Sequence, residues 1–260
     1  MKFLKDLKKY YSYAAYSAAA ELKSQVASNY LGWLWWILDP LLFMFVYTFI
    51  VKYVFRSNDE NLSLMVFTGL TAWNFFSGTV QSSVSIIRSY RSVLQKVYLP
   101  KFILILMNEI INFIKMLIGT GLCIIVAVIS GIPVSLNILL LIPIIAVYFL
   151  LTFGISLISA HIGVYIADFS NIMTVLLRLL FYLSGVFYKL STLPPRLLKA
   201  YNMLCPTGVI IDQFRLALGL SGAEKADFLI LLYWLGAGII FSAIGLYLTY
   251  KHENNYMKVI

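Results

Sequence analysis

The sequence predicts an all-α integral membrane protein with six transmembrane helices. Of its 260 residues, 61% are hydrophobic and 12% are charged, whereas soluble domains are about half apolar and about a quarter charged. The mean hydropathy is +0.87, and several apolar stretches reach the roughly 20 residues that a helix needs to cross a bilayer. The net charge of +9 comes from basic residues spread between these stretches, a distribution that does not indicate a nucleic-acid-binding surface.

Residues 1–29 are predicted to form an amphipathic helix at the cytoplasmic membrane surface. Apolar residues recur there at steps of three and four, and most of the lysines lie off this stripe. A basic amphipathic helix next to a span is typical of the membrane interface, although a short helix packed on a partner is the alternative. The stripe comprises Leu4, Leu7, Tyr11, Ala15, Ala18, Leu22 and Val26.

Six apolar segments follow, and we expect them to form one membrane domain over residues 1–260. Tryptophans at the start of the first segment, Trp33, Trp35 and Trp36, indicate its interfacial end. The expected spans are about 33–55, 64–87, 102–130, 138–166, 170–188 and 228–250.

The distribution of basic residues predicts the orientation. Six spans put both termini on one side, together with the segment between the second and third spans. The segments 1–32, 88–101 and 251–260 hold five, four and two lysines or arginines. By the positive-inside rule that side is the cytoplasm.

Residues 189–227 form the outer connection between the fifth and sixth spans, and we expect two short helices in them. Pro194 and Pro195 precede one apolar–polar run, and Pro206 precedes a second run that Gly219 ends. Both runs are too short to cross a bilayer, so we interpret them as outer re-entrant or gate helices. An ordinary structured loop is the alternative. Five basic residues make this segment an exception to the positive-inside rule.

Polar side chains recur at helical spacing inside two of the predicted spans. Polar groups at membrane depth avoid lipid, so they line a wet cavity or join neighbouring helices, and the pattern leaves both possibilities open for the amides. A lysine at that depth needs a partner or water, which favours a protein-facing position. These residues are Asn74 and Gln81 in the second span, and Asn108, Asn112 and Lys115 in the third.

Aromatic residues are abundant, with 18 Tyr, 18 Phe and 5 Trp. Most aromatic residues in spans pack against other helices or anchor at the interface. Some could instead line a path for sugar rings, whose apolar C–H faces stack on aromatic rings. The best candidates for such a path are Tyr47, Trp73, Phe76 and Tyr188.

The sequence lacks the motifs of the common enzyme chemistries. It has no G-x-x-x-x-G-K-[ST] phosphate loop, no H-E-x-x-H metal motif and no G-x-S-x-G nucleophile motif. Its two histidines are far apart, and Cys123 and Cys205 do not form a spaced pair. We therefore expect no catalytic residue, no metal site and no cofactor in this chain. An integral membrane enzyme of glycolipid metabolism is kept as an alternative.

Several stretches together resemble the ABC-2-type permeases that export polysaccharides such as O-antigen, capsule and teichoic acid. "NYLGWLWWILDPLLFMFVYTFI" is similar to the family's opening, which has a proline just inside the first span. "FTGLTAWNFF", followed by "KVYLP" before the third span, is the closest match, and "LCPTGVIIDQFRLALGLSG" resembles a later signature. Their order and spacing are specific in combination.

The resemblance implies a homodimer that pairs with two copies of a separate ATPase subunit, where ATP and magnesium bind. It implies a lipid-linked glycan as the substrate, contact with membrane lipids, and a location in the bacterial cytoplasmic membrane. The absence of a phosphate loop agrees with a permease that depends on a partner for ATP hydrolysis. Within transport, an ABC-2 exporter of a drug, a lipid or a peptide is the alternative.

The basic segment 88–101 lies between the second and third predicted spans. Arg88 and Arg91 are three residues apart, so we expect them on one face of a short helix. Given the resemblance, we predict that this segment couples the ATPase to the spans, although a topology signal alone is the alternative. The predicted coupling residues are Arg88, Arg91, Lys96 and Pro100, with Leu94 and Val97 as the apolar contact.

Overall fold

The computed structural model describes residues 2–27, 31–54, 61–132, 136–220 and 227–259. All of its regular elements in these ranges are helices, which confirms the all-α prediction. The long helices are α1 (Lys2–Ala27), α2 (Trp35–Phe49), α3 (Leu62–Ser89), α5 (Lys101–Ile129), α6 (Leu141–Tyr165), α7 (Phe169–Leu183) and α10 (Phe228–Lys251). The shorter ones are α4 (Arg91–Leu94), α8 (Pro195–Leu204), α9 (Pro206–Ala217) and α11 (Glu253–Val259). Three short 3-10 helices, η1 (Gly32–Leu34), η3 (Leu136–Leu140) and η4 (Leu190–Thr192), and a π-helical turn, η2 (Ile50–Val54), complete the set.

Three helical segments of the described chain are long and apolar enough to cross a membrane. They are Lys101–Ile129, Leu136–Tyr165 and Phe228–Lys251. Helices α2 and α7 are apolar but shorter, and α3 is 28 residues long and carries the polar stripe seen in the sequence. The chain is thus a multi-pass membrane protein, while six crossings remain a prediction.

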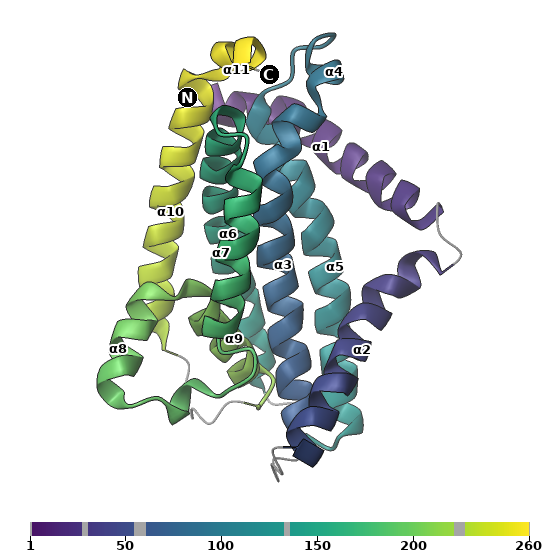
Figure 1. Ribbon diagram of the computed structural model, residues 1–260, viewed down its shortest axis with the longest axis vertical. Helices are drawn as coiled ribbons and strands as arrows, with labels where there is room; N and C mark the ends of the chain where they lie inside the picture. The colour runs from purple at the N-terminus through teal and green to yellow at the C-terminus, as the bar shows by residue number, and fades with distance from the viewer. Residues whose placement is uncertain (1, 28–30, 55–60, 133–135, 221–226, 260) are drawn as a thin grey trace.

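Helix α3 lies at the centre of the bundle, with α5 and α6 packed against it and α10 packed along α6 (Figure 1). Small residues allow this close approach. A Cβ atom added at Gly154 of α6 would lie 2.6 Å from the backbone nitrogen of Ser242 in α10. One added at Gly163 would overlap the carbonyl oxygen of Val84 in α3.

Different short helices lie at the two ends of the bundle. Helices α4 and α11 lie with both termini at one end, whereas α8 and α9 lie at the other (Figure 1). The amphipathic helix α1 runs obliquely away from the first end and packs against α5. The two short helices expected in residues 189–227 are present as α8 and α9. Helix α9 is mostly buried and packs on α3, whereas α8 buries no residue.

The fifth predicted span is longer than the helix that is found. Helix α7 ends at Leu183, five residues before the expected end at residue 188. Gly185 follows in the left-handed region at φ 70°, a conformation that glycine adopts without steric cost and that ends a helix. Tyr188 therefore lies in the connection after α7 and not within a span.

Candidate functional site: a polar groove along α3

Three adjoining hollows make one groove along the polar face of α3. The first, of about 420 Å³, lies between α2, α3 and α7. The second lies between α2, α3 and α5 and shares Asp39, Asn74 and Ser77 with the first. The third is bordered by α1 and shares Gly78 and Lys115 with the second. We call this continuous surface the polar groove.

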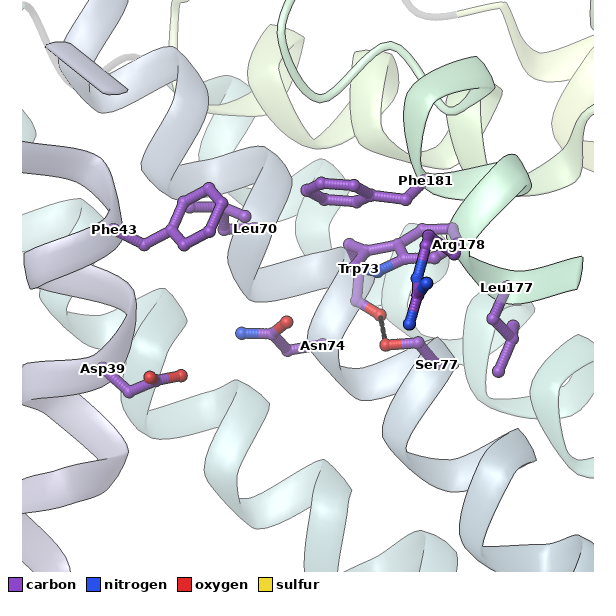
Figure 2. A pocket seen from close by; sticks show the side chains of 9 residues that line it. All are labelled: Asp39, Phe43, Leu70, Trp73, Asn74, Ser77, Leu177, Arg178 and Phe181. Atoms are coloured by element: carbon purple, nitrogen blue, oxygen red, sulfur yellow. Dashed lines mark hydrogen bonds between the residues drawn. The ribbon is translucent and has the colours of Figure 1, made fainter. Parts of the chain in front are cut away.

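The first hollow combines rings with hydrogen-bonding side chains (Figure 2). Asp39 of α2 and Arg178 of α7 approach it from opposite sides, and Asn74 of α3 lies between them. Trp73 and Arg178 both border the hollow, and Phe181 lies next to Trp73 with the ring centroids 5.5 Å apart. The hollow therefore offers apolar ring surface next to a carboxylate, an amide and a guanidinium.

Of the four rings predicted to line a path, only Trp73 borders the groove. Phe76 is buried and stacks on Tyr148 of α6 at 6.2 Å. Tyr47 stacks on Phe187 at 4.1 Å, and the Tyr188 hydroxyl donates to the Leu183 carbonyl at 2.9 Å. These three rings contact neighbouring groups of the same subunit and lie outside the polar groove, and their role in a path stays a prediction.

Two phenylalanines that the sequence analysis did not select complete the first hollow. Phe43 of α2 and Phe181 of α7 both border it, with their ring centroids 6.4 Å apart. Arg178 and Asp39 were missed as well. The spacing of Leu177, Arg178 and Phe181 within α7 places them near one face, a signal that the sequence analysis did not use.

The predicted polar residues border the groove, join helices or do both, and Asn108 also borders the third hollow. Asn74 borders the first two hollows. Asn108 of α5 is buried and donates to the Thr79 carbonyl and the Ser83 hydroxyl of α3, both at 3.1 Å. Gln81 donates to the hydroxyl and carbonyl oxygens of Ser170 in α7. Both alternatives left open by the sequence thus occur.

Lys115 and Asn112 border the groove where α5 faces the end of α1. The Lys115 ammonium donates to the Gln25 side chain of α1 at 3.0 Å, and it lies 5.3 Å from the Trp36 ring centroid. Asn112 donates to the Asn108 carbonyl at 3.1 Å. The lysine is therefore protein-facing, with an amide and a ring as its partners. Tryptophan near the start of α2 is typical of the interface with water.

The basic segment 88–101 is built differently from the expected short helix. Arg88 lies in the last turn of α3 and donates to the Val164 carbonyl of α6 at 2.9 Å, whereas Arg91 lies in the separate helix α4 and is exposed. The two arginines therefore do not share one short helix. Leu94 is 7% exposed and Val97 is 61% exposed, so these two residues do not form one apolar docking face.

The other two predicted coupling residues, Lys96 and Pro100, lie in the second half of the segment. Lys96 is exposed. Pro100 is buried and immediately precedes α5, which agrees with a proline at a helix start. The role of the segment in coupling remains a prediction.

Buried charged residues were also missed, and Arg215 and Glu109 are two of them. Arg215 of α9 is 1% exposed and donates to the carbonyls of Met65, Gly185, Val186 and Tyr188 at 2.7–3.1 Å. Glu109 of α5 is fully buried, and neither carboxylate oxygen has a hydrogen-bond partner within the described part of the chain. Because burial depends on which helix faces meet, neither environment could be read from the local sequence.

A family model described as ABC-2 type transporter matches residues 15–219. The chain belongs to the ABC-2 type transporter family. Two O-antigen export system permease proteins RfbA of Klebsiella pneumoniae are similar to it, at 26% and 27% identity over 243 residues and 92% of each chain. The RfbA permease of Myxococcus xanthus is 28% identical over 193 residues, 74% of each chain.

These findings confirm the resemblance seen in the sequence. Membership of the ABC-2 family implies that the chain pairs with an ATPase subunit. The relatives are named as permeases, which fits a transport subunit better than the alternative of a membrane enzyme.

Proposed function

We propose that this ABC-2 family member is the permease subunit of an exporter that carries a lipid-linked polysaccharide across the bacterial cytoplasmic membrane. Two copies of the chain form the channel, and two separate ATPase subunits bind ATP and magnesium and supply the energy. The similarity to O-antigen export permeases over most of the chain supports this substrate class. The proposed substrate class includes capsular and teichoic-acid polymers as well as O-antigen.

The first hollow of the polar groove carries the proposal. Sugar rings present apolar C–H faces and a rim of hydroxyl groups. Trp73 and Phe181 offer ring surface on which the C–H faces can stack. Asp39, Asn74 and Arg178 offer hydrogen-bond acceptors and donors for the hydroxyl groups. Channels need contacts that are favourable but weak enough to release what they carry. An exporter of drugs or lipids would favour a lining with fewer hydrogen-bonding groups.

The substrate is tested by deletion of the gene. We expect a lipid-linked glycan to accumulate on the cytoplasmic side of the membrane, because synthesis continues while export stops. The measurement is extraction and mass analysis of the lipid-linked intermediates. A deletion strain with normal surface polysaccharide and no accumulated intermediate would exclude the proposed substrate.

The path is tested with Trp73→Leu and Phe181→Leu. Each change removes a ring from the first hollow, and a ring contact contributes about 0.5–1.5 kcal/mol, so we expect export to slow by about two- to tenfold. Export is measured as surface polysaccharide per assembled complex. The matched control is Phe149→Leu, because that ring packs on Phe113 between α5 and α6. Normal export by both groove variants would reject the hollow as the path.

A further inference from the structure

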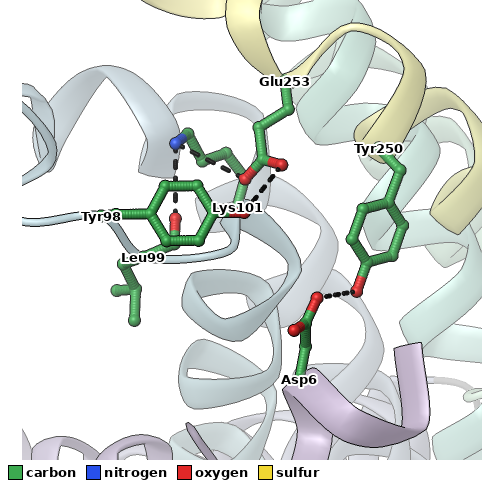
Figure 3. Close-up of polar contacts among 6 residues, drawn as sticks. All are labelled: Asp6, Tyr98, Leu99, Lys101, Tyr250 and Glu253. Carbon is green, nitrogen blue, oxygen red and sulfur yellow. Dashed lines mark hydrogen bonds and ion pairs between the residues drawn. The ribbon is translucent and has the colours of Figure 1, made fainter. Parts of the chain in front are cut away.

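The C-terminal helix α11 contacts the end of the basic segment 88–101 (Figure 3). Glu253, its first residue, is 7% exposed. One carboxylate oxygen accepts a hydrogen bond from the Tyr98 hydroxyl at 3.2 Å, and the other lies 3.7 Å from the Lys101 ammonium. Loss of water around the hydroxyl and the charge of Glu253 raise the pKa of Tyr98 to about 12. The hydroxyl therefore keeps its proton and remains a donor in the cell.

Glu253 bridges a stretch of chain that has no helix of its own. Helix α4 ends at Leu94 and α5 begins at Lys101, and the residues between them form turns and extended chain. Tyr98 lies in this stretch, and Lys101 is the first residue of α5. A displacement of the basic segment could be absorbed by bending here. The Glu253 carboxylate contacts Tyr98 within the stretch and Lys101 at its end, and this pair of contacts restricts bending between these two residues.

The helix that carries Glu253 is itself anchored to the bundle. The hydroxyl of Tyr256, a fully buried side chain, lies 2.7 Å from Nδ1 of His161 in α6. Helix α11 also follows α10 directly, with His252 between them. The bridge thus connects the basic segment to α5, α6 and α10.

The burial of the Lys101–Glu253 ion pair suits a role in fixing the position of the basic segment relative to α5. Lys101 is 4% exposed and also donates to the Leu99 carbonyl at 3.3 Å. Moving two charges out of water costs free energy that their attraction often only balances, so a buried pair contributes little net stability, whereas in some proteins such a pair fixes one geometry. Here the fixed geometry is the join between the basic segment and α5.

We propose that Glu253 is a positioning residue that makes the basic segment, the start of α5 and the C-terminal helix move as one body. This role rests on the proposed function in one respect, namely that an ATPase subunit displaces the segment. The displacement then reaches α5 and the α6–α10 pair together and is not lost in the non-helical stretch.

The test uses the purified complex of the chain with its ATPase, assembled with Tyr98→Phe or Glu253→Gln. Tyr98→Phe deletes the hydrogen bond, and Glu253→Gln removes the charge that faces Lys101. The first readout is hydrogen exchange with and without ATP. We expect wild-type complexes to show a nucleotide-dependent change in both residues 91–98 and residues 101–106. In the variants we expect the change to persist in 91–98 and to be lost in 101–106.

The second readout is polysaccharide exported per ATP hydrolysed. We expect this ratio to fall about threefold or more in both variants, while ATPase binding and hydrolysis continue. The matched control is Tyr250→Phe, which deletes a tyrosine hydroxyl that donates to the Asp6 carboxylate at 2.9 Å at the same end of the molecule (Figure 3). Tyr250→Phe keeps the ring, whose centroid lies 5.8 Å from that of Phe102, and leaves both contacts of Glu253 in place, so both readouts should keep their wild-type values.

A charge exchange separates positioning from simple loss of structure. Glu253→Lys should abolish the nucleotide-dependent change in residues 101–106. The double variant Lys101→Glu/Glu253→Lys should restore it, because opposite charges face each other again and the Tyr98 hydroxyl can accept a hydrogen bond from an ammonium at position 253. The proposal is overturned if Tyr98→Phe and Glu253→Gln transmit the change normally, or if Tyr250→Phe loses it equally. The hydrogen-exchange measurement needs no polysaccharide. A wild-type complex that transmits the change but exports no glycan therefore contradicts the proposed substrate and leaves the positioning role supported.

Discussion

At the scale of single residues, the hydrogen-bonding capacity of one arginine organises the end of the bundle that carries α8 and α9. Arg215 donates to four carbonyl oxygens contributed by the start of α3 and by the connection after α7. Because α7 ends at Leu183, the carbonyls of Gly185, Val186 and Tyr188 lie outside a helix. The planar guanidinium provides five donors in a fixed arrangement, so it satisfies several of them at once.

This arrangement predicts a large difference between arginine and lysine at position 215. Arg215→Lys keeps the charge but offers one compact ammonium in place of a planar fork. We expect a loss of about 3 kcal/mol in the free energy of unfolding, typical of breaking a buried charged network. The measurement is thermal unfolding in detergent, and the control is Arg196→Lys on the exposed surface of α8. Equal unfolding temperatures for both variants would contradict the structural role.

At the scale of elements, the basic segment and the helices beside it determine which surface can meet an ATPase subunit. Leu94 packs in a cluster with Ala14 and Leu22 of α1 and with Phe102 of α5, so it belongs to the interior of this subunit. Val97 and Val93 remain exposed. The apolar contact with the partner is therefore expected to come from the two valines.

Val97→Asp tests that surface. We expect the ATPase to bind at least about tenfold more weakly, because burying a valine is worth roughly 1.5–3 kcal/mol and a buried carboxylate adds a cost. The measurement is co-purification of the ATPase with the membrane-inserted chain. The control is Ser92→Asp, which adds the same charge at an exposed position of the segment without removing an apolar group. Normal co-purification of the Val97 variant would leave the segment as a topology signal only.

At the scale of the whole molecule, the two ends of the bundle carry different elements. Helices α4 and α11 and both termini share one end, and α8 and α9 share the other (Figure 1). The start of α1, the helix α4 and the helix α11 lie at the end with the termini. This arrangement supports the prediction that this end faces the cytoplasm.

Single cysteines in a background of Cys123→Ser and Cys205→Ser test the orientation. Ser92 in α4 and Ser191 in η4 are both exposed, and they lie at opposite ends of the predicted topology. We expect an impermeant thiol reagent to label Ser191→Cys in intact cells and to label Ser92→Cys only after lysis. The reverse pattern would invert the orientation. Labelling of both in intact cells would contradict the six-span arrangement. Ser221, a more central position of the outer segment, lies outside the described residues.

The sequence by itself determined the membrane class, the family and the ranges of most helices. Those properties depend on composition, on local apolar periodicity and on short motifs such as "FTGLTAWNFF", all of which act within a few turns of chain. Arg178 and Asp39 lie far apart in the sequence and face the same hollow. Tyr98 and Glu253 are likewise distant in sequence and share a hydrogen bond. Only the tertiary structure decided such pairings, and with them which rings border the groove and why Leu94 is buried, because they depend on which faces of remote helices meet.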